Sequence, residues 1–197
     1  MSLKGDEKMD RKRGNGEVKI KRKFVLINVA VKGARPLLMN DSFDEETGPA
    51  KKGKVYDDVE ECEKRLIKDK DGNICQKAIH FEASMIKSAA EFKFQGNKTY
   101  KDLFKAGVFV EPLFIPHLLN KWEIDKQKVR IGAAGIMRAR PRFDEWELEF
   151  QIRCMDDRIE FLVLKQVLEN AGMYIGVGDY RPRYGLFDIT KFELING

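Results

Sequence analysis

Apolar and polar residues alternate in two stretches of the chain, which predicts two strands of a half-buried sheet. Residues 18–31 alternate at first, and both parities then become apolar, as in a strand buried on both faces. Residues 145–155 alternate throughout, so one face should be buried and the other exposed. The expected buried set is Trp146, Leu148, Phe150 and Ile152, and the expected exposed set is Glu147, Glu149 and Gln151.

Three segments instead repeat apolar residues at the spacing of a helix, namely 55–67, 82–94 and 158–170. Gly96 and Gly172 should end the second and third of them. Further strands are expected at 108–115, 128–136 and 184–195, and the middle one contains Gly132 and Gly135. The turn sequence Asp69–Asn73 predicts a hairpin that joins residues 65–68 to residues 74–79.

The order of these elements predicts an α+β fold of the ferredoxin-like (RRM-like) type, a β-α-β-β-α-β arrangement. Its antiparallel sheet would carry two helices on one face and leave the other face open to a partner. A loop and hairpin insertion is expected at about 34–78 within a single domain spanning 17–197. Residues 1–16 are polar, charged and rich in glycine, and they should form a flexible basic arm.

Composition excludes several classes of protein. The 197 residues include 13 Phe and are 43% hydrophobic, which excludes a disordered chain. The sequence has neither an apolar run of roughly 18 residues, as a membrane helix needs, nor a secretory signal. Its three cysteines are widely spaced and suit neither a disulfide framework nor a zinc site. A cytoplasmic protein without membrane contact is therefore expected.

The charge is unevenly distributed. Residues 1–23 carry the whole net charge of +5, and the remainder of the chain is neutral. Within that remainder, residues 41–63 are strongly acidic, whereas residues 126–142 hold six bases and no acid. A basic segment of this kind can create a local field where phosphates bind.

A glycine-rich segment, Gly176–Gly185, follows the last predicted helix and precedes the last strand. Glycines allow a backbone to approach a phosphate, arginines bind phosphates and tyrosines stack on bases. A dinucleotide fingerprint needs the order strand, glycines, helix, so it is excluded here. The alternative is a helix cap followed by a turn. The residues that predict binding are Gly176, Gly178, Tyr180, Arg181, Arg183, Tyr184 and Gly185.

Residues 176–187 resemble the C-terminal glycine-rich motif of the RAMP superfamily, which supplies RNA-binding subunits of CRISPR effector complexes. Residues 33–38 and 79–90 are similar to other parts of those chains. Residues 138–146 and 176–182 also resemble uncharacterised proteins of phages and prophages. The resemblance implies a RAMP-like fold and a non-enzymatic protein of phage or mobile-element type. Its partner would be single-stranded RNA or DNA.

The basic segment supplies the second candidate group. If residues 138–142 are extended, their three arginines share one face, a geometry that suits a phosphate backbone. The alternatives are a solvated strand edge, or pairing with Asp144 and Glu145. The candidate phosphate contacts are Lys128, Arg130, Arg138, Arg140 and Arg142.

Catalytic and metal chemistry have weaker support. His80, with Lys87 further along, could transfer protons in a metal-independent RNA endonuclease, and His117 is the only other histidine. No spacing of ligands predicts a metal, and no cofactor is expected. Three functions therefore remain open: a nucleic-acid-binding protein, a phage assembly protein and an endonuclease. The first two leave room for a homo-oligomer or a larger protein complex.

Overall fold

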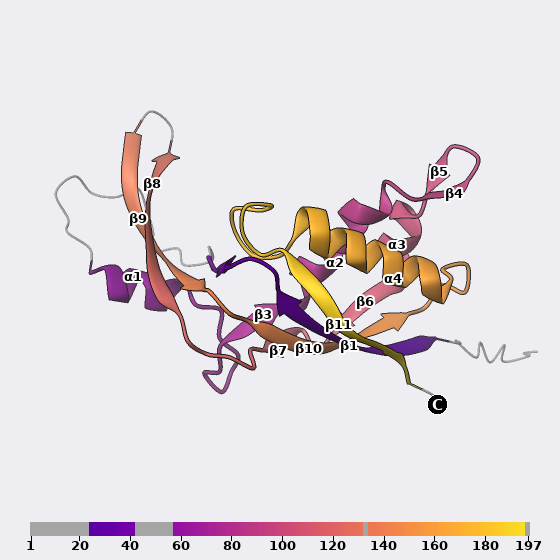
Figure 1. The fold of residues 1–197 in the computed structure, drawn as a ribbon, viewed down its shortest axis with the longest axis horizontal. Coiled ribbons are helices and arrows are strands. Elements are labelled where there is room, and N and C mark those ends of the chain that lie inside the picture. The colour runs from indigo at the N-terminus through magenta and orange to yellow at the C-terminus, as the bar shows by residue number, and fades with distance from the viewer. Residues whose placement is uncertain (1–23, 42–56, 132–133, 196–197) are drawn as a thin grey trace, which may run out of the picture.

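The computed structural model describes residues 24–41, 57–131 and 134–195, with a mixed α+β fold and mostly antiparallel sheets (Figure 1). The predicted arm at residues 1–16, the start of the first strand and most of the acidic loop lie outside the described residues.

The main sheet has four antiparallel strands in the order β11-β1-β10-β6. The alternation in β10 is confirmed, because Trp146 just before it and Leu148, Phe150 and Ile152 within it are all buried. On the other parity, Glu149 is exposed, and Glu147 and Gln151 are partly so. The four strands are β1 (Val25–Gly33), β6 (Val108–Glu111), β10 (Glu147–Cys154) and β11 (Phe187–Leu194).

Three helices cover one face of this sheet, where two were predicted (Figure 1). They are α2 (Ala78–Ala89), α3 (Lys101–Gly107) and α4 (Phe161–Asn170). Phe81 on α2 packs on the sheet, with its ring centroid 4.6 Å from that of Phe150 and 5.4 Å from that of Phe187. The core therefore lies between the helical layer and the sheet.

The limits of all three predicted helices differ from the observed ones, and the first and third begin about three residues later than predicted. The second begins at Ala78 and ends at Ala89 rather than spanning 82–94, because residues 93–99 form the small strands β4 (Lys93–Gln95) and β5 (Lys98–Thr99). Gly172 does not end the third helix: the chain continues as a π-helical turn, η1 (Ala171–Ile175). A Cβ at Gly172 would lie 2.3 Å from the carbonyl oxygen of Phe187, so this glycine permits close packing against β11.

The predicted strand at 128–136 is wrong, because two strands occupy this part of the chain. β8 (Glu123–Ile131) and β9 (Ala134–Phe143) form an antiparallel hairpin, in which Ile131 faces Ala134. The hairpin projects from the main body, and α1 (Asp58–Arg65) lies beside it (Figure 1). The short strand β2 (Leu37–Leu38) pairs with β9 and so attaches the hairpin to the chain that follows β1.

The predicted hairpin around Asp69 is correct only at its turn. Lys68 and Ile74 form an isolated bridge, and Asp69 accepts hydrogen bonds from the backbone N–H groups of Asp71 and Asn73. The strand that follows, β3 (Cys75–Lys77), pairs with β7 (Phe114–Pro116).

Candidate functional site

The glycine-rich loop, residues 176–185, is closed at its neck by backbone hydrogen bonds. Gly176 takes a φ of +76° where the π-helical turn ends, and its N–H donates to the carbonyl of Ala171 at 2.8 Å. The N–H of Val177 donates to the carbonyl of Gly185 at 2.9 Å. Gly185 also has a positive φ, +74°, and a Cβ there would lie 1.8 Å from the carbonyl oxygen of Val177. Only glycine fits where the two ends of the loop meet.

The loop rests on the segment that follows β1. The N–H of Asp179 donates to the carbonyl of Leu38 at 2.9 Å, and the N–H of Gly185 donates to that of Pro36 at 2.8 Å. A Cβ at Gly178 would lie 2.5 Å from Cδ1 of Leu37. The glycines thus bring protein backbone together, and the N–H groups of Gly176 and Gly185 are used within the protein. Those two N–H groups are therefore not available to bind a phosphate.

The three arginines of β9 are also engaged within the protein, so the structure does not present them as free phosphate contacts. The alternative of pairing is confirmed for Arg142, whose partner Asp144 had been predicted. Arg138 pairs with Glu61 at 3.0 Å and Arg140 with Asp179 at 2.9 Å, and their side chains are only 12% and 11% exposed. Arg142 is bound by Asp144 at 2.8 Å and by Glu123 at 3.0 Å. The hydrogen bonds that Arg142 donates to the carboxylate of Asp144 raise the pKa of Arg142 above its ordinary value.

Glu61 on α1 connects the acidic and basic segments of the chain. Its carboxylate accepts hydrogen bonds from Arg65 and Arg138, both at 3.0 Å, and from the backbone N–H of Ala139 at 3.1 Å. Lys126 pairs with Asp58 on the same helix at 2.7 Å. The opposite charges of residues 41–63 and 126–142 therefore serve in part to hold α1 on the hairpin.

The hairpin and the glycine-rich loop adjoin each other. Besides the pair between Arg140 and Asp179, the side-chain amide of Gln127 donates to the hydroxyl of Tyr184 at 3.0 Å. Lys128 and Arg130 lie beyond this contact, toward the end of the hairpin, where the register places them opposite Met137 and Gly135. Lys128 is exposed, and no contact among the described side chains joins this end of the hairpin to the loop.

The tip of the loop, unlike β9, presents exposed arginines and a tyrosine. Tyr180 takes a positive φ of +59°, uncommon for a residue other than glycine, and its N–H donates to its neighbour Asp179 at 2.9 Å. Its ring lies 6.2 Å from that of Tyr184, edge to face. Arg181 and Arg183 are exposed, and neither guanidinium forms an ion pair with a carboxylate in the described part of the chain.

A hollow of about 360 Å³ lies between this tip, the end of the π-helical turn and α2. Tyr174 and Tyr180 line it with exposed fractions of 64% and 53%, and Lys87 and Arg181 supply positive charge. The remaining lining residues are Ile175, Gly178, Asp179 and Pro182. Neither Tyr174 nor Lys87 was predicted to bind nucleic acid from the sequence. Tyr174 adjoins the glycine-rich segment, and Lys87 lies two helical turns from His80, but neither pattern distinguishes a binding residue from an ordinary surface residue.

His80 on α2 is partly buried close to the loop. Its Nδ1 is hydrogen-bonded to the side-chain amide of Gln76. Burial lowers the pKa of His80 below its ordinary value, and the positive charges of Arg181 and Lys77 lower it further. Both effects favour the neutral imidazole, and one of its ring nitrogens is already engaged.

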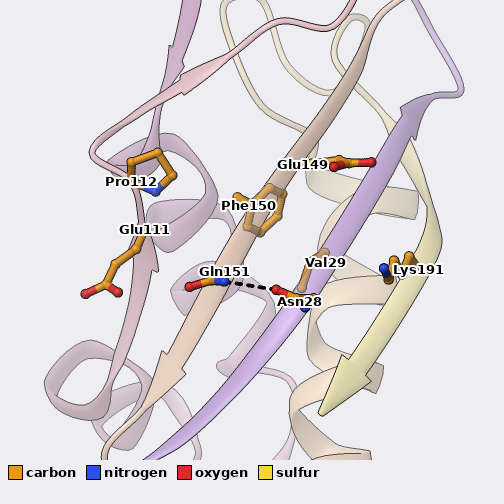
Figure 2. Close-up of a pocket in the computed structure, with 8 residues that line it drawn as sticks. All are labelled: Asn28, Val29, Glu111, Pro112, Glu149, Phe150, Gln151 and Lys191. Atoms are coloured by element: carbon orange, nitrogen blue, oxygen red, sulfur yellow. Dashed lines mark hydrogen bonds between the residues drawn. The ribbon is translucent and has the colours of Figure 1, made fainter. Parts of the chain in front are cut away.

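The open face of the main sheet has a different character. A hollow of about 500 Å³ there is bordered by amides and charged groups from β1, β6, β10 and β11 (Figure 2). Gln151 donates to Asn28 at 3.0 Å across the strands, with Glu149, Glu111 and Lys191 around them. The two carboxylates that border this hollow, those of Glu111 and Glu149, would repel the phosphates of a nucleic-acid strand.

Among the described residues, no group of three or more His, Cys, Asp or Glu could hold a metal ion, and all three cysteines are buried and free. None of the helices that the structure describes has the length and apolar character needed to cross a membrane.

Comparison with known proteins adds no family to this description: no family model matches the chain, and no curated protein matches it significantly.

Proposed function

We propose that this chain is a non-enzymatic protein that binds a single strand of RNA or DNA at the tip of the glycine-rich loop. The observation that carries this proposal is the hollow beside the tip, where Tyr174 and Tyr180 are exposed next to Lys87 and Arg181. Cations neutralise phosphates and tyrosines stack on bases, so this combination suits a nucleic-acid strand. Arg183, exposed nearby, extends the positive surface.

A ferredoxin-like fold is part of this proposal. Without the segments between β1 and α2 and between β6 and β10, the chain runs β1-α2-β6-β10-α4-β11, apart from the short elements that follow α2. In the sheet order β11-β1-β10-β6, the first strand of this series, β1, lies between the fourth, β11, and the third, β10. Both features support a β-α-β-β-α-β domain and, with it, the resemblance to RAMP proteins and phage proteins. A cytoplasmic location follows from the same proposal.

The experiment is a direct binding measurement. Full-length protein should retain nucleic acid on purification, which raises the ratio of absorbance at 260 nm to that at 280 nm. After the nucleic acid is removed with high salt, the protein should bind a fluorescein-labelled single-stranded oligonucleotide in an anisotropy titration. A matched control is the variant Lys98→Ala with Lys105→Ala, which removes two exposed lysines that lie outside the hollow. Failure to bind RNA or DNA at low salt would reject the proposed function.

An assembly protein is the second candidate, and two exposed apolar residues favour it. Ile79 and Leu113 are largely exposed, and their chain segments are adjacent, because the N–H of Ala78 donates to the carbonyl of Leu113 at 2.9 Å. Such side chains suit a protein contact. Purified protein free of nucleic acid that forms a defined oligomer would favour this function.

The endonuclease hypothesis depends on His80, which lies close enough to Arg181 for its pKa to be affected. The test is cleavage of single-stranded RNA in the presence of a chelator. Loss of that cleavage in His80→Ala would establish the enzyme, and no cleavage by the wild-type protein would exclude it.

A further inference from the structure

We propose that the hollow between Tyr174 and Tyr180 receives the base of one unpaired nucleotide. The base stacks on a tyrosine, and the adjacent phosphates of the strand lie toward Lys87 and Arg181. This inference rests on the proposed function and specifies how the strand would be held. It predicts that bases, as well as phosphates, contribute to affinity.

The size and lining of the hollow agree with this occupant. Its volume of about 360 Å³ falls near the lower end of the range of small-molecule sites, about 300–1,000 Å³. The aromatic groups come from separate elements, Tyr174 from the π-helical turn and Tyr180 from the loop. Because every base has a π face, tyrosine stacking accepts any base.

Tyr180 is held in place before any ligand binds. Its backbone has a positive φ, and its N–H is bonded to the carboxylate of Asp179. Its ring lies against that of Tyr184, whose hydroxyl accepts a hydrogen bond from Gln127 on the hairpin. A side chain positioned in this way loses little conformational freedom on binding, which favours affinity.

The charges around the hollow also suit a nucleotide. Among the described residues that line it, Asp179 is the only carboxylate, and Arg140 lies 2.9 Å from its Oδ2 on the protein side. That pairing reduces the repulsion that a phosphate would meet from Asp179. Lys87 and Arg181 remain available on the solvent side, and both are exposed.

The occupant must be unpaired. A base inside a duplex is stacked on both faces and presents only its edges, so it cannot lie flat against a tyrosine without leaving the helix. The hollow therefore favours single strands, or the unpaired nucleotides of a loop.

The test compares a single-stranded oligonucleotide with an abasic strand of the same length and charge, using the full-length protein. Wild-type protein should bind the base-bearing strand more tightly. The double variant Tyr174→Leu with Tyr180→Asn should lose roughly 5- to 150-fold in affinity for that strand and leave binding of the abasic strand nearly unchanged. Asparagine is chosen because it tolerates positive φ. Met173→Ala, which removes an exposed neighbour of Tyr174 outside the lining of the hollow, should behave like wild type.

Equal losses for both strands, or no loss for either, would overturn the base-binding inference while leaving the proposed function in place. Failure of the wild-type protein to bind either strand would reject the proposed function and this inference together. Thermal unfolding of each variant shows whether it remains folded.

Discussion

Arg140 on β9 reaches Asp179 in the glycine-rich loop, with 2.9 Å between its Nη1 and the carboxylate Oδ2. Asp179 is also bonded through its N–H to Leu38, in the short strand that pairs with β9. One residue of the loop is therefore tied to two neighbouring strands. This arrangement fixes where the tip of the loop lies. Arg140 therefore positions the candidate site and is not itself a phosphate contact.

Replacing Arg140 by Met should destabilise the protein by about 1–3 kcal/mol, because the partly buried carboxylate of Asp179 loses its charged partner. Urea unfolding at neutral pH measures the change. The control is Arg158→Met, which breaks a more exposed pair with Asp156 and should change the free energy of unfolding by about 0.5 kcal/mol or less. Similar values for the two variants would contradict the assigned role of Arg140.

Gly185→Ala should be strongly destabilising, by about 3 kcal/mol or more. The added Cβ would lie 1.8 Å from the carbonyl oxygen of Val177, at a residue that already has a positive φ. Gly72→Ala separates these two effects, since Gly72 has a φ of +85° and a Cβ there would meet no heavy atom of the described residues within 4 Å. That variant should lose only about 1–2 kcal/mol, the cost of the backbone conformation. A Gly185 variant no less stable than the Gly72 variant would show that the neck of the loop opens easily.

His117 makes the stability of the protein depend on pH. Its ring is buried against Phe143, neither ring nitrogen has a hydrogen-bond partner among the described residues, and burial lowers its pKa from 6.5 to about 4. Below pH 6.5 the unfolded chain therefore takes up a proton that the folded protein does not. Stability should be highest above that pH and fall as the pH decreases, by about 2 kcal/mol at roughly pH 5 and by about 3 kcal/mol below the folded pKa.

The measurement is urea unfolding of the wild type and of His117→Leu at about pH 7.5 and about pH 5. Leu has a similar volume and no proton to bind, so this part of the pH dependence should disappear in the variant. The hypothesis is wrong if the two proteins lose the same free energy of unfolding between the two pH values.

Periodicity predicted the parts of the fold in which local pattern and burial agree. The alternation around Phe150 marks β10, and the helical spacing around Met85 and Val167 marks the helices that cover the sheet. The projecting hairpin was not predicted, because its two strands pair mainly with each other and their alternation follows no continuous core. Gly172 was predicted to end a helix, but it instead permits close packing against β11. A glycine that ends a helix and one that admits a neighbouring strand look the same in a sequence.

The candidate site was only partly predictable. The arginines of β9 and the tyrosines of the loop were both visible in the sequence. Asp144 was predicted as an alternative partner and does pair with Arg142, but the partners of Arg138, Arg140 and Tyr184 were not predicted. Charge pairing between Glu61 and Arg138 joins residues 77 positions apart and depends on how α1 packs on the hairpin. The opposite charges of the two segments were the available signal, and they did not specify which side chains would pair.

The salt dependence of oligonucleotide binding tests most directly whether the phosphate contacts come from the loop tip and α2 rather than from β9. Changing Lys87, Arg181 and Arg183 together to Ala should flatten the slope of log affinity against log salt by roughly 2, at about 0.7 for each contact with a single strand. Arg142→Ala, which removes a β9 arginine held by Asp144 and Glu123, should leave the slope unchanged. An unchanged slope in the triple variant, or a flattened slope in Arg142→Ala, would contradict this account.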